Sequence, residues 1–245
     1  MMNGIFSTLS GKIANETKLD IIANNLANAL TAGFKASRPA FDSDLIEGGP
    51  EPDQLPSAYV NIPDSYIHFS DAPITQTSNN LDLAIEGSGF FAVSTPQGIM
   101  YTRNGQFTLD SDKKLVTQDG NPVQGVNGGD ITVEGNQNGK DIKIDRDGSV
   151  YVDKIFVDKV KVVDFADKKP LKYSGTSLFS NTDINNTEVP PQNFSVVQGA
   201  YETSNVNVMK EMVDMMSAMR AYESYTQIDQ NMADMLDKLI DLGKF

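Results

Sequence analysis

A Gly-Ser-Gly turn is the first place in this sequence where residue types and spacing could do chemistry. The spacing G-x-G-x-x-A occurs at Gly87-Ser88-Gly89-Phe90-Phe91-Ala92, and in dinucleotide-binding proteins such a turn opens a helix that receives a pyrophosphate. Here the following residues, Val93 to Pro96, continue as strand and turn. Ser88 does not fit a nucleophile elbow, because Glu86 and Phe90 occupy the flanking glycine positions. We therefore expect no bound cofactor and no catalytic serine.

An acidic turn and a single histidine are the remaining candidates, and both concern metal binding. An EF-hand that began at Asp145 would need glycine at its sixth position, whereas Gly148 is the fourth residue of the run. A tight β-turn explains this pattern better, since Asp and Gly are typical turn residues. His68 is the only histidine and the chain has no cysteine, so neither a His/Cys metal site nor a thiol nucleophile is expected.

Composition and charge exclude several further classes of protein. The net charge is −13 over 245 residues, whereas nucleic acids and anionic membranes attract basic surfaces. No run of eighteen apolar residues and no N-terminal signal peptide is evident. No acid, base and nucleophile converge in the pattern. We therefore predict that the chain is not an enzyme, binds no small-molecule substrate or nucleic acid, does not insert into a membrane, and carries no cleaved signal peptide.

Apolar residues near the C-terminus recur at alternating steps of four and three, which predicts a long amphipathic helix with a heptad seam. The seam consists of Val208, Met212, Met215, Met219, Tyr222, Tyr225, Ile228, Met232, Met235, Leu239 and Leu242. Two consecutive steps of three, from Tyr222 to Ile228, shift its phase once. A helix of roughly 37 residues is about 55 Å long, too long to bury its stripe in a domain of this size, so it requires partner helices.

A second seam at the N-terminus predicts such a partner. It consists of Met2, Ile5, Leu9, Leu19, Ala23, Leu26 and Leu30, interrupted by Lys12 and Glu16. The charged pair either fixes the register of helix pairing or faces solvent, and the pattern alone leaves both interpretations open. The helix should end near Thr31 to Gly33, where glycine suits a left-handed C-terminal position.

The middle of the chain changes from irregular to strand-like at Leu81. Residues 37–80 are rich in proline and predict an extended linker with one or two edge strands. From Leu81 the apolar period becomes two, and short β runs alternate with Gly, Asn and Asp turns. We predict an α+β fold: residues 1–36 and 199–245 pair as an α-helical coiled-coil domain, 37–80 form the linker, and 81–198 form an all-β domain, an antiparallel sandwich or barrel.

Several blocks resemble those of bacterial flagellar rod and hook proteins. The N-terminal block N-N-[IL]-A-N-x-x-T-x-G-[FY]-K is matched from Asn24 to Lys35, although Leu30 stands where a polar residue is usual. Three central blocks are matched in order, within Leu81–Phe91, Tyr101–Phe107 and Leu115–Gly125. Near the C-terminus the matching blocks are Gln198–Asn207, Glu211–Met215 and Arg220–Glu223. Within this family, the chain is most similar to the proximal rod proteins.

The resemblance implies a structural subunit of the flagellar basal body, in the rod that spans the periplasm. It implies polymerisation of the terminal helices with copies of the chain and with other rod proteins, and export by the flagellar export apparatus. The expected subunit-interface residues are Leu19, Asn24, Asn25, Leu26, Asn28, Gly33, Phe34, Asn205, Asn207, Met212, Met215, Met219, Arg220, Tyr222, Glu223, Met232 and Leu239. Two alternatives remain: a distal rod protein, or a soluble β binding module or adhesin with a homo-oligomeric coiled coil.

Overall fold

The protein is described by a computed structural model that places residues 2–40, 43–45, 58–60, 65–133 and 142–242. The chain forms two compact units. The helical unit contains Met1–Ala27, Ser37–Tyr66 and Asn207–Phe245, and the β unit contains Asn28–Ala36 and Ile67–Val206. The chain therefore crosses between the two units four times.

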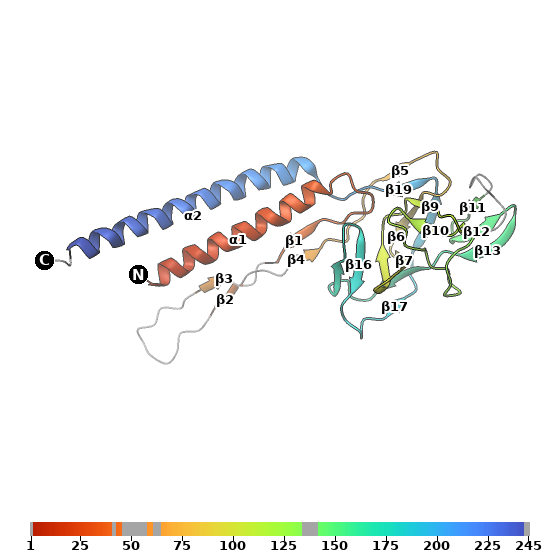
Figure 1. Ribbon diagram of the computed structural model, residues 1–245, viewed down its shortest axis with the longest axis horizontal. Coiled ribbons are helices and arrows are strands. Elements are labelled where there is room, and N and C mark those ends of the chain that lie inside the picture. Colours follow the sequence, from red (N-terminus) through yellow and green to blue (C-terminus); the bar gives the residue numbers. More distant parts are fainter. Residues whose placement is uncertain (1, 41–42, 46–57, 61–64, 134–141, 243–245) are drawn as a thin grey trace. The chain divides into compact units, whose positions relative to one another are not determined.

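Two long helices lie side by side in the helical unit (Figure 1): α1 spans Met2–Ala27 and α2 spans Val208–Leu242. Small side chains are buried on both helices, at Ala14 on α1 and Ala218 on α2. A Cβ atom added to Gly11 would lie 2.7 Å from the ring of Tyr225. The two helix backbones therefore approach closely through small residues.

Lys12 of α1 faces α2, whereas Glu16 is exposed. The Lys12 ammonium lies 3.7 Å from the Asp229 carboxylate and 5.4 Å from the centre of the Tyr222 ring. Of the charged pair that interrupts the N-terminal seam, one member thus contacts the partner helix and the other faces solvent.

Helix α1 ends about one turn before the predicted position, so the prediction that it continues to Thr31 is wrong. Its last residue is Ala27, and the Thr31 N–H donates to the Asn28 carbonyl in the turn that follows. Leu30, the last residue of the predicted seam, is 97 % exposed. Asparagine side chains compete with helical hydrogen bonds, and Asn25 bonds the backbone of Ser37 instead.

Short strands occupy the segment predicted to be an extended linker. They are β1 (Ser37–Pro39), β2 (Ser43–Leu45), β3 (Ala58–Val60), β4 (Ser65–Ile67) and β5 (Ile74–Gln76). β2 pairs with β3 in antiparallel fashion, and β1 is the neighbour of β4.

The β unit is built from short strands, joined mostly by tight turns. They are β6 (Leu83–Gly87), β7 (Phe90–Thr95), β8 (Gly98–Thr102), β9 (Phe107–Leu109), β10 (Leu115–Thr117), β11 (Ile142–Ile144), β12 (Ser149–Val152), β13 (Ile155–Lys159), β14 (Val162–Phe165), β15 (Leu171–Tyr173), β16 (Leu178–Asn181), β17 (Glu188–Val189), β18 (Phe194–Gln198) and β19 (Ala200–Glu202). The largest sheet is a half-barrel with the order β15-β16-β8-β7-β14-β17. The predicted N-terminal helix, central β-rich domain and C-terminal helix are confirmed.

Both faces of the half-barrel are covered, as strand β7 demonstrates. Successive side chains of a strand point to opposite faces. Phe91 and Val93 lie in one hydrophobic cluster, whereas Phe90 and Ala92 lie in a second. All four side chains are fully buried. Continuous burial along the strand explains why Phe90–Val93 is a run of apolar residues rather than an alternating one.

Candidate assembly surface

The first three turns of α2 carry an exposed apolar surface, which we call the methionine face. Its members are Met209, Met212, Val213, Met216 and Met219. They recur at steps of three and four and therefore lie on one side of the helix. The exposed fraction is 74 % for Met209 and 51 % for Met219.

The opposite side of α2 is the one that packs in the helical unit. Glu211, Ala218 and Tyr225 follow one another at steps of seven; the first two are buried, and the Tyr225 ring meets Gly11 of α1. The predicted seam runs from one side to the other, since it shares Met212 and Met219 with the methionine face and Tyr225 with the packed side. Its members Met215, Tyr222 and Met232 are half-buried, whereas Met212 and Met219 are exposed. The contact with α1 thus covers only one edge of the seam.

The remaining predicted interface residues of the helices differ in exposure. Arg220, Glu223 and Asn24 are exposed, whereas Leu19, Leu26 and Asn28 are half-buried. The side chain of Leu239 lies outside the described residues. Asn207 is exposed and caps α2, because its side-chain oxygen accepts from the Lys210 N–H at 3.1 Å.

Asn25 is fully buried and uses its hydrogen bonds inside the helical unit. Its amide oxygen accepts from the Ser37 N–H at 2.8 Å, and its amide nitrogen donates to the Ser37 carbonyl at 2.9 Å. The same nitrogen lies 3.4 Å from the Glu211 carboxylate. Glu211 is itself fully buried, and Arg38 donates to it at 2.7 Å. These contacts fasten the segment after α1 to α2.

Gly33 and Phe34 are buried inside the β unit. Gly33 has a φ of +68°, and a Cβ atom at this position would lie 2.2 Å from the Asn104 nitrogen. Phe34 stacks on Tyr173, with ring centres 5.3 Å apart and planes at 14°. Asn205 holds Ala36, two residues after Phe34, since its side-chain oxygen accepts from the Ala36 N–H at 2.6 Å. These three residues thus make their contacts within the chain itself.

A buried ionic cluster lies beside these residues in the β unit. The Glu202 carboxylate accepts from Lys35 at 2.6 Å through one oxygen and from Arg103 at 3.1 Å through the other. Arg103 also donates to the carbonyl of Gly87 at 2.7 Å. Burial lowers the pKa of Lys35, and the Glu202 charge opposes this effect. The sequence patterns did not predict this cluster. Its only trace in the local sequence is a charged residue beside apolar ones.

The acidic turn and the neighbouring cleft offer no catalytic or metal-binding geometry. Gly148 has a φ of +89° and donates to the Asp145 carbonyl, as in a tight turn. Hydrogen bonds from the Ser149 backbone and hydroxyl lower the pKa of Asp147. In the described part of the chain, no group of three His, Cys, Asp or Glu residues could hold a metal ion.

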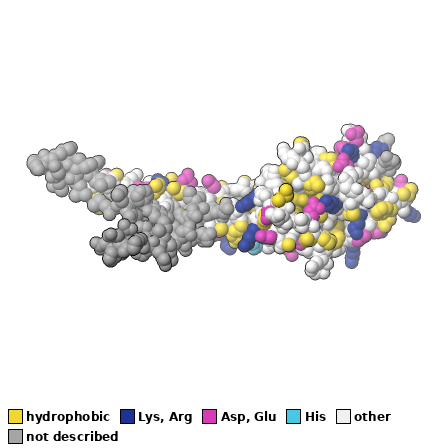
Figure 2. Space-filling model, turned by 90° about the horizontal axis from the view of Figure 1, so that it is seen from below, with side chains coloured by type: hydrophobic (Ala, Val, Ile, Leu, Met, Phe, Trp, Pro, Cys, Tyr) yellow, Lys and Arg dark blue, Asp and Glu magenta, His cyan; other side chains and the backbone are white. Residues whose placement is uncertain are grey.

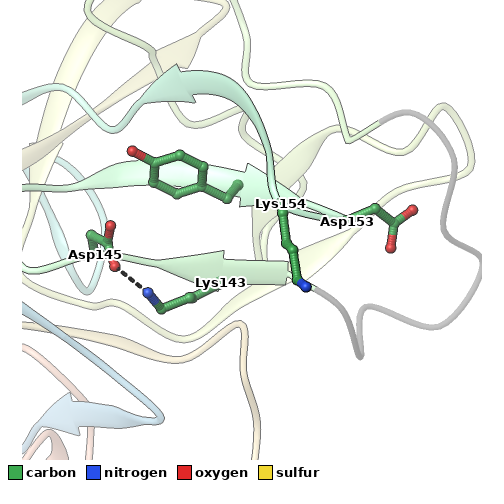
Figure 3. Close-up of a pocket in the computed structure, with 5 residues that line it drawn as sticks. Lys143, Asp145, Asp153 and Lys154 are labelled. Atoms are coloured by element: carbon green, nitrogen blue, oxygen red, sulfur yellow. Dashed lines mark ion pairs between the residues drawn. The ribbon is translucent and has the colours of Figure 1, made fainter.

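The cleft has a volume of about 660 Å³ and is open to solvent (Figure 3). Lys143 and Asp145 in it point toward each other as an ion pair of 2.8 Å, whereas Asp153 and Lys154 project from the β12–β13 turn. Figure 2 shows charges of both signs mixed with apolar side chains on the face of the β unit that it displays. Neither described helix is apolar and long enough to cross a bilayer.

Comparisons with known proteins match both ends and the middle of the chain. Three family profiles match: "Flagella basal body rod protein" at residues 7–35, "Flagellar hook protein FlgE/F/G D1 domain" at 84–152 and "Flagellar basal body rod FlgEFG protein C-terminal" at 197–242. The chain is 33 % identical to the flagellar basal-body rod protein FlgF of Caulobacter vibrioides, with 100 % of this chain and 99 % of the relative covered.

Other relatives are similar over their whole length. The identity is 31 % to the flagellar basal-body rod protein FlgG of Bacillus subtilis, with 100 % of both chains covered. It is 33 % to FlgG of Buchnera aphidicola subsp. Acyrthosiphon pisum, with 99 % of this chain and 100 % of the relative covered. With full-length coverage at this identity and profile matches at both ends and in the middle, the chain belongs to the flagellar basal-body rod protein family.

Proposed function

We propose that this chain is a structural subunit of the proximal flagellar rod and that its terminal helices polymerise into the helical drive shaft. The observation that carries the proposal is the methionine face, five exposed apolar side chains on the first three turns of α2. Water contact with such a surface is unfavourable, and a neighbouring helix that covers it is stabilised by roughly 25 cal/mol per Å² of apolar area.

The type of side chain also favours contacts with several different neighbours. Four of the five members of the methionine face are methionines. Methionine is unbranched and polarisable, so it adapts to helices with different surfaces. A rod subunit touches copies of itself and other rod proteins, and one adaptable face serves both.

The geometry of a single repeated contact accounts for a shaft. A contact between two different patches of identical subunits produces an open helical filament when its rotation does not close a ring. In this proposal α1 and α2 form a coiled coil, and 1–36 with 199–245 form the polymerising domain. The contacts are made by Met212, Met215, Met219, Tyr222, Met232 and Leu239 on α2, Leu19 and Leu26 on α1, with Asn24 and Asn28 as polar partners and Arg220 and Glu223 at the rim.

The proposed location is the rod in the periplasm, which the subunit reaches through the flagellar export apparatus without a cleaved signal peptide. Gly33, Phe34, Asn25, Asn205 and Asn207 hold the segments next to the helices. In the assembled rod they would act on the interface through the placement of the helices.

A charge on the methionine face tests the proposal. Met219→Asp places a carboxylate in the contact between subunits, and we expect rod assembly and swimming to be lost. The matched control is Ser217→Asp, which adds the same charge at an exposed polar position two residues away. Thermal unfolding by circular dichroism should be the same for both variants, since neither position is buried. Normal swimming of Met219→Asp cells with wild-type amounts of the subunit would show that the methionine face is not the contact.

A further inference from the structure

Two buried carboxylates near the C-terminus each receive a cation from the segment that follows α1. In the β unit, Lys35 donates to Glu202 at 2.6 Å. In the helical unit, Arg38 donates to Glu211 at 2.7 Å. Both carboxylates are almost completely buried. Each unit therefore contains a buried carboxylate whose ion pair joins the segment after α1 to a late part of the chain.

Glu202 differs from Glu211 in the number of segments that depend on it. One carboxylate oxygen accepts from Lys35 and from the Ala72 N–H at 2.9 Å, and the other accepts from Arg103. The Glu202 carbonyl accepts from the Gly33 N–H at 2.8 Å. Four hydrogen bonds thus bring three separate segments of the β unit to one residue.

The charge balance at Glu202 makes its absence costly. Lys35 is 1 % exposed and Arg103 is 5 % exposed, so the β unit buries two cations against this one carboxylate. Removal of an apolar core residue leaves a cavity, but removal of this carboxylate leaves two buried like charges without their partner. Loss of one member of a buried ion pair is among the most destabilising single changes. Burial lowers the pKa of Lys35 and the Arg103 charge lowers it further, which is consistent with this imbalance.

We propose that Glu202 is a folding checkpoint: the β unit, including its early strands β7 and β8, does not fold stably until the Glu202 carboxylate enters the site between Lys35 and Arg103. The chain is made from the N-terminus, so both cations exist long before residue 202 of 245 does. The β unit accordingly remains unfolded until the segment that contains Glu202 is available. This dependence does not require that the methionine face be the contact between subunits.

The test compares two isosteric variants of the full chain by amide hydrogen exchange. Glu202→Gln keeps the shape of the side chain and removes its charge, and we expect exchange of the β7 and β8 amides to accelerate on the order of a hundredfold. Glu211→Gln is the matched control, since it removes an equally buried carboxylate from the helical unit. It should change β7 and β8 exchange by no more than about twofold, because Glu211 makes its ion pair within the other unit and sites that share no partners act independently. Exchange within twofold of wild type in Glu202→Gln would overturn the checkpoint.

A rescue experiment separates charge imbalance from ordinary packing, even when Glu202→Gln does not fold. The double variant Lys35→Met, Glu202→Gln removes one of the two cations, and we expect it to slow β7 and β8 exchange at least about tenfold relative to Glu202→Gln alone. A double variant as fast as Glu202→Gln, or faster, would contradict the charge argument.

The order of folding is tested by pulse labelling during refolding of the wild-type chain. Protection of β7 and β8 amides should appear in the same kinetic phase as that of β19, which contains Glu202. Protection of β7 and β8 in an earlier phase would overturn the proposal.

Discussion

Gly33 places the chain inside the β unit in a backbone conformation that few residues adopt. Its φ of +68° lies in the left-handed region, and the Asn104 nitrogen occupies the space where a side chain would begin. Both features restrict this position to glycine, the first through backbone strain and the second through steric overlap.

The variant Gly33→Ala should therefore lower the free energy of unfolding by about 2 kcal/mol or more, since left-handed backbone alone costs about 1–2 kcal/mol in a residue with a Cβ. Gly128→Ala is the matched control, because Gly128 has a φ of +82° but no atom within 4 Å of the added Cβ. Urea denaturation measures the free energy of unfolding of both variants. Equal losses in the two variants would show that the overlap with Asn104 contributes nothing.

Two tyrosines, the buried Tyr101 and the half-buried Tyr173, make the stability of the β unit sensitive to alkaline pH. Burial raises the pKa of both Tyr101 and Tyr173, and the hydrogen bond to Glu188 raises that of Tyr101 further. A raised pKa means that the unfolded state loses its proton first. The stabilisation is therefore complete below about pH 10, the ordinary tyrosine pKa, and is lost as pH rises above it.

Lys35 has the opposite effect on the free energy of unfolding, at lower pH than the tyrosines. Its pKa is lowered in the folded state, so its penalty diminishes as pH rises toward the unfolded value of about 10.5. We expect the free energy of unfolding to fall between pH 10.5 and 11.5, because Lys35 no longer opposes the tyrosines there. Ion pairs raise the pKa of Lys114 and Lys143, which acts in the same direction as the tyrosines. Urea titrations at each pH measure it. In the Tyr101→Phe variant, the free energy of unfolding should fall less steeply with pH. Tyr66→Phe is the control, because Tyr66 is exposed, and this variant should show the same pH dependence as the wild-type chain. A flat profile in the wild-type chain would contradict the tyrosine argument.

At the scale of elements, the pairing of α1 with α2 depends on small residues. Ala218 is 1 % exposed on the packed side of α2, and its smallness allows the helices to approach. Leucine at this position would have to displace atoms of the facing helix, and overpacking of this kind costs about 1–3 kcal/mol.

Ala218→Leu should thus accelerate amide exchange in the central turns of α2. Ala233→Leu places the same side chain at an exposed position of the same helix, where the effect should stay within about 0.5 kcal/mol. Equal amide exchange rates in the two variants would show that α1 and α2 do not pair through Ala218.

Local patterns predicted the elements of regular period and missed those formed by distant pairing. Strands β6 to β12 lie within the stretch from Leu81 to Val152, for which the sequence predicts short β runs. Strand β19 pairs with β5 across more than a hundred residues, with Tyr201 opposite Thr75. Neither strand alternates apolar and polar residues, since Ile74-Thr75-Gln76 ends in two polar residues and Ala200-Tyr201-Glu202 begins with two apolar ones. Such strands exist only because tertiary contacts hold them.

The buried charges escaped prediction for a similar reason. Lys35, Arg103 and Glu202 are far apart in sequence and belong to residue types that are almost never fully buried without a partner. Their pairing follows from the fold and not from spacing.

The exposed methionines could be identified from the helical seam, but the seam does not say which edge of it α1 covers.

At the scale of the whole molecule, the full-length similarity to flagellar rod proteins confirms that the chain is structural and not an enzyme. It also places the protein at the flagellar basal body, in assembly with other rod components. The two units interleave in sequence, since Asn28–Ala36 belongs to the β unit although Ser37–Tyr66 belongs to the helical unit. No change of composition at Asn28 indicates that the chain enters the β unit there.

The passage of Asn28–Ala36 through the β unit has a mechanical consequence. The β unit is tied to the helices by short stretches of chain, one after α1 that leads to Gly33 and one before α2 that starts after Glu202. The Gly33 N–H is bonded to the Glu202 carbonyl. The Ala36 N–H is likewise bonded to the Asn205 side chain. Tension applied along either helix would reach the β unit where these bonds join the two tethers, so both tethers would share the load.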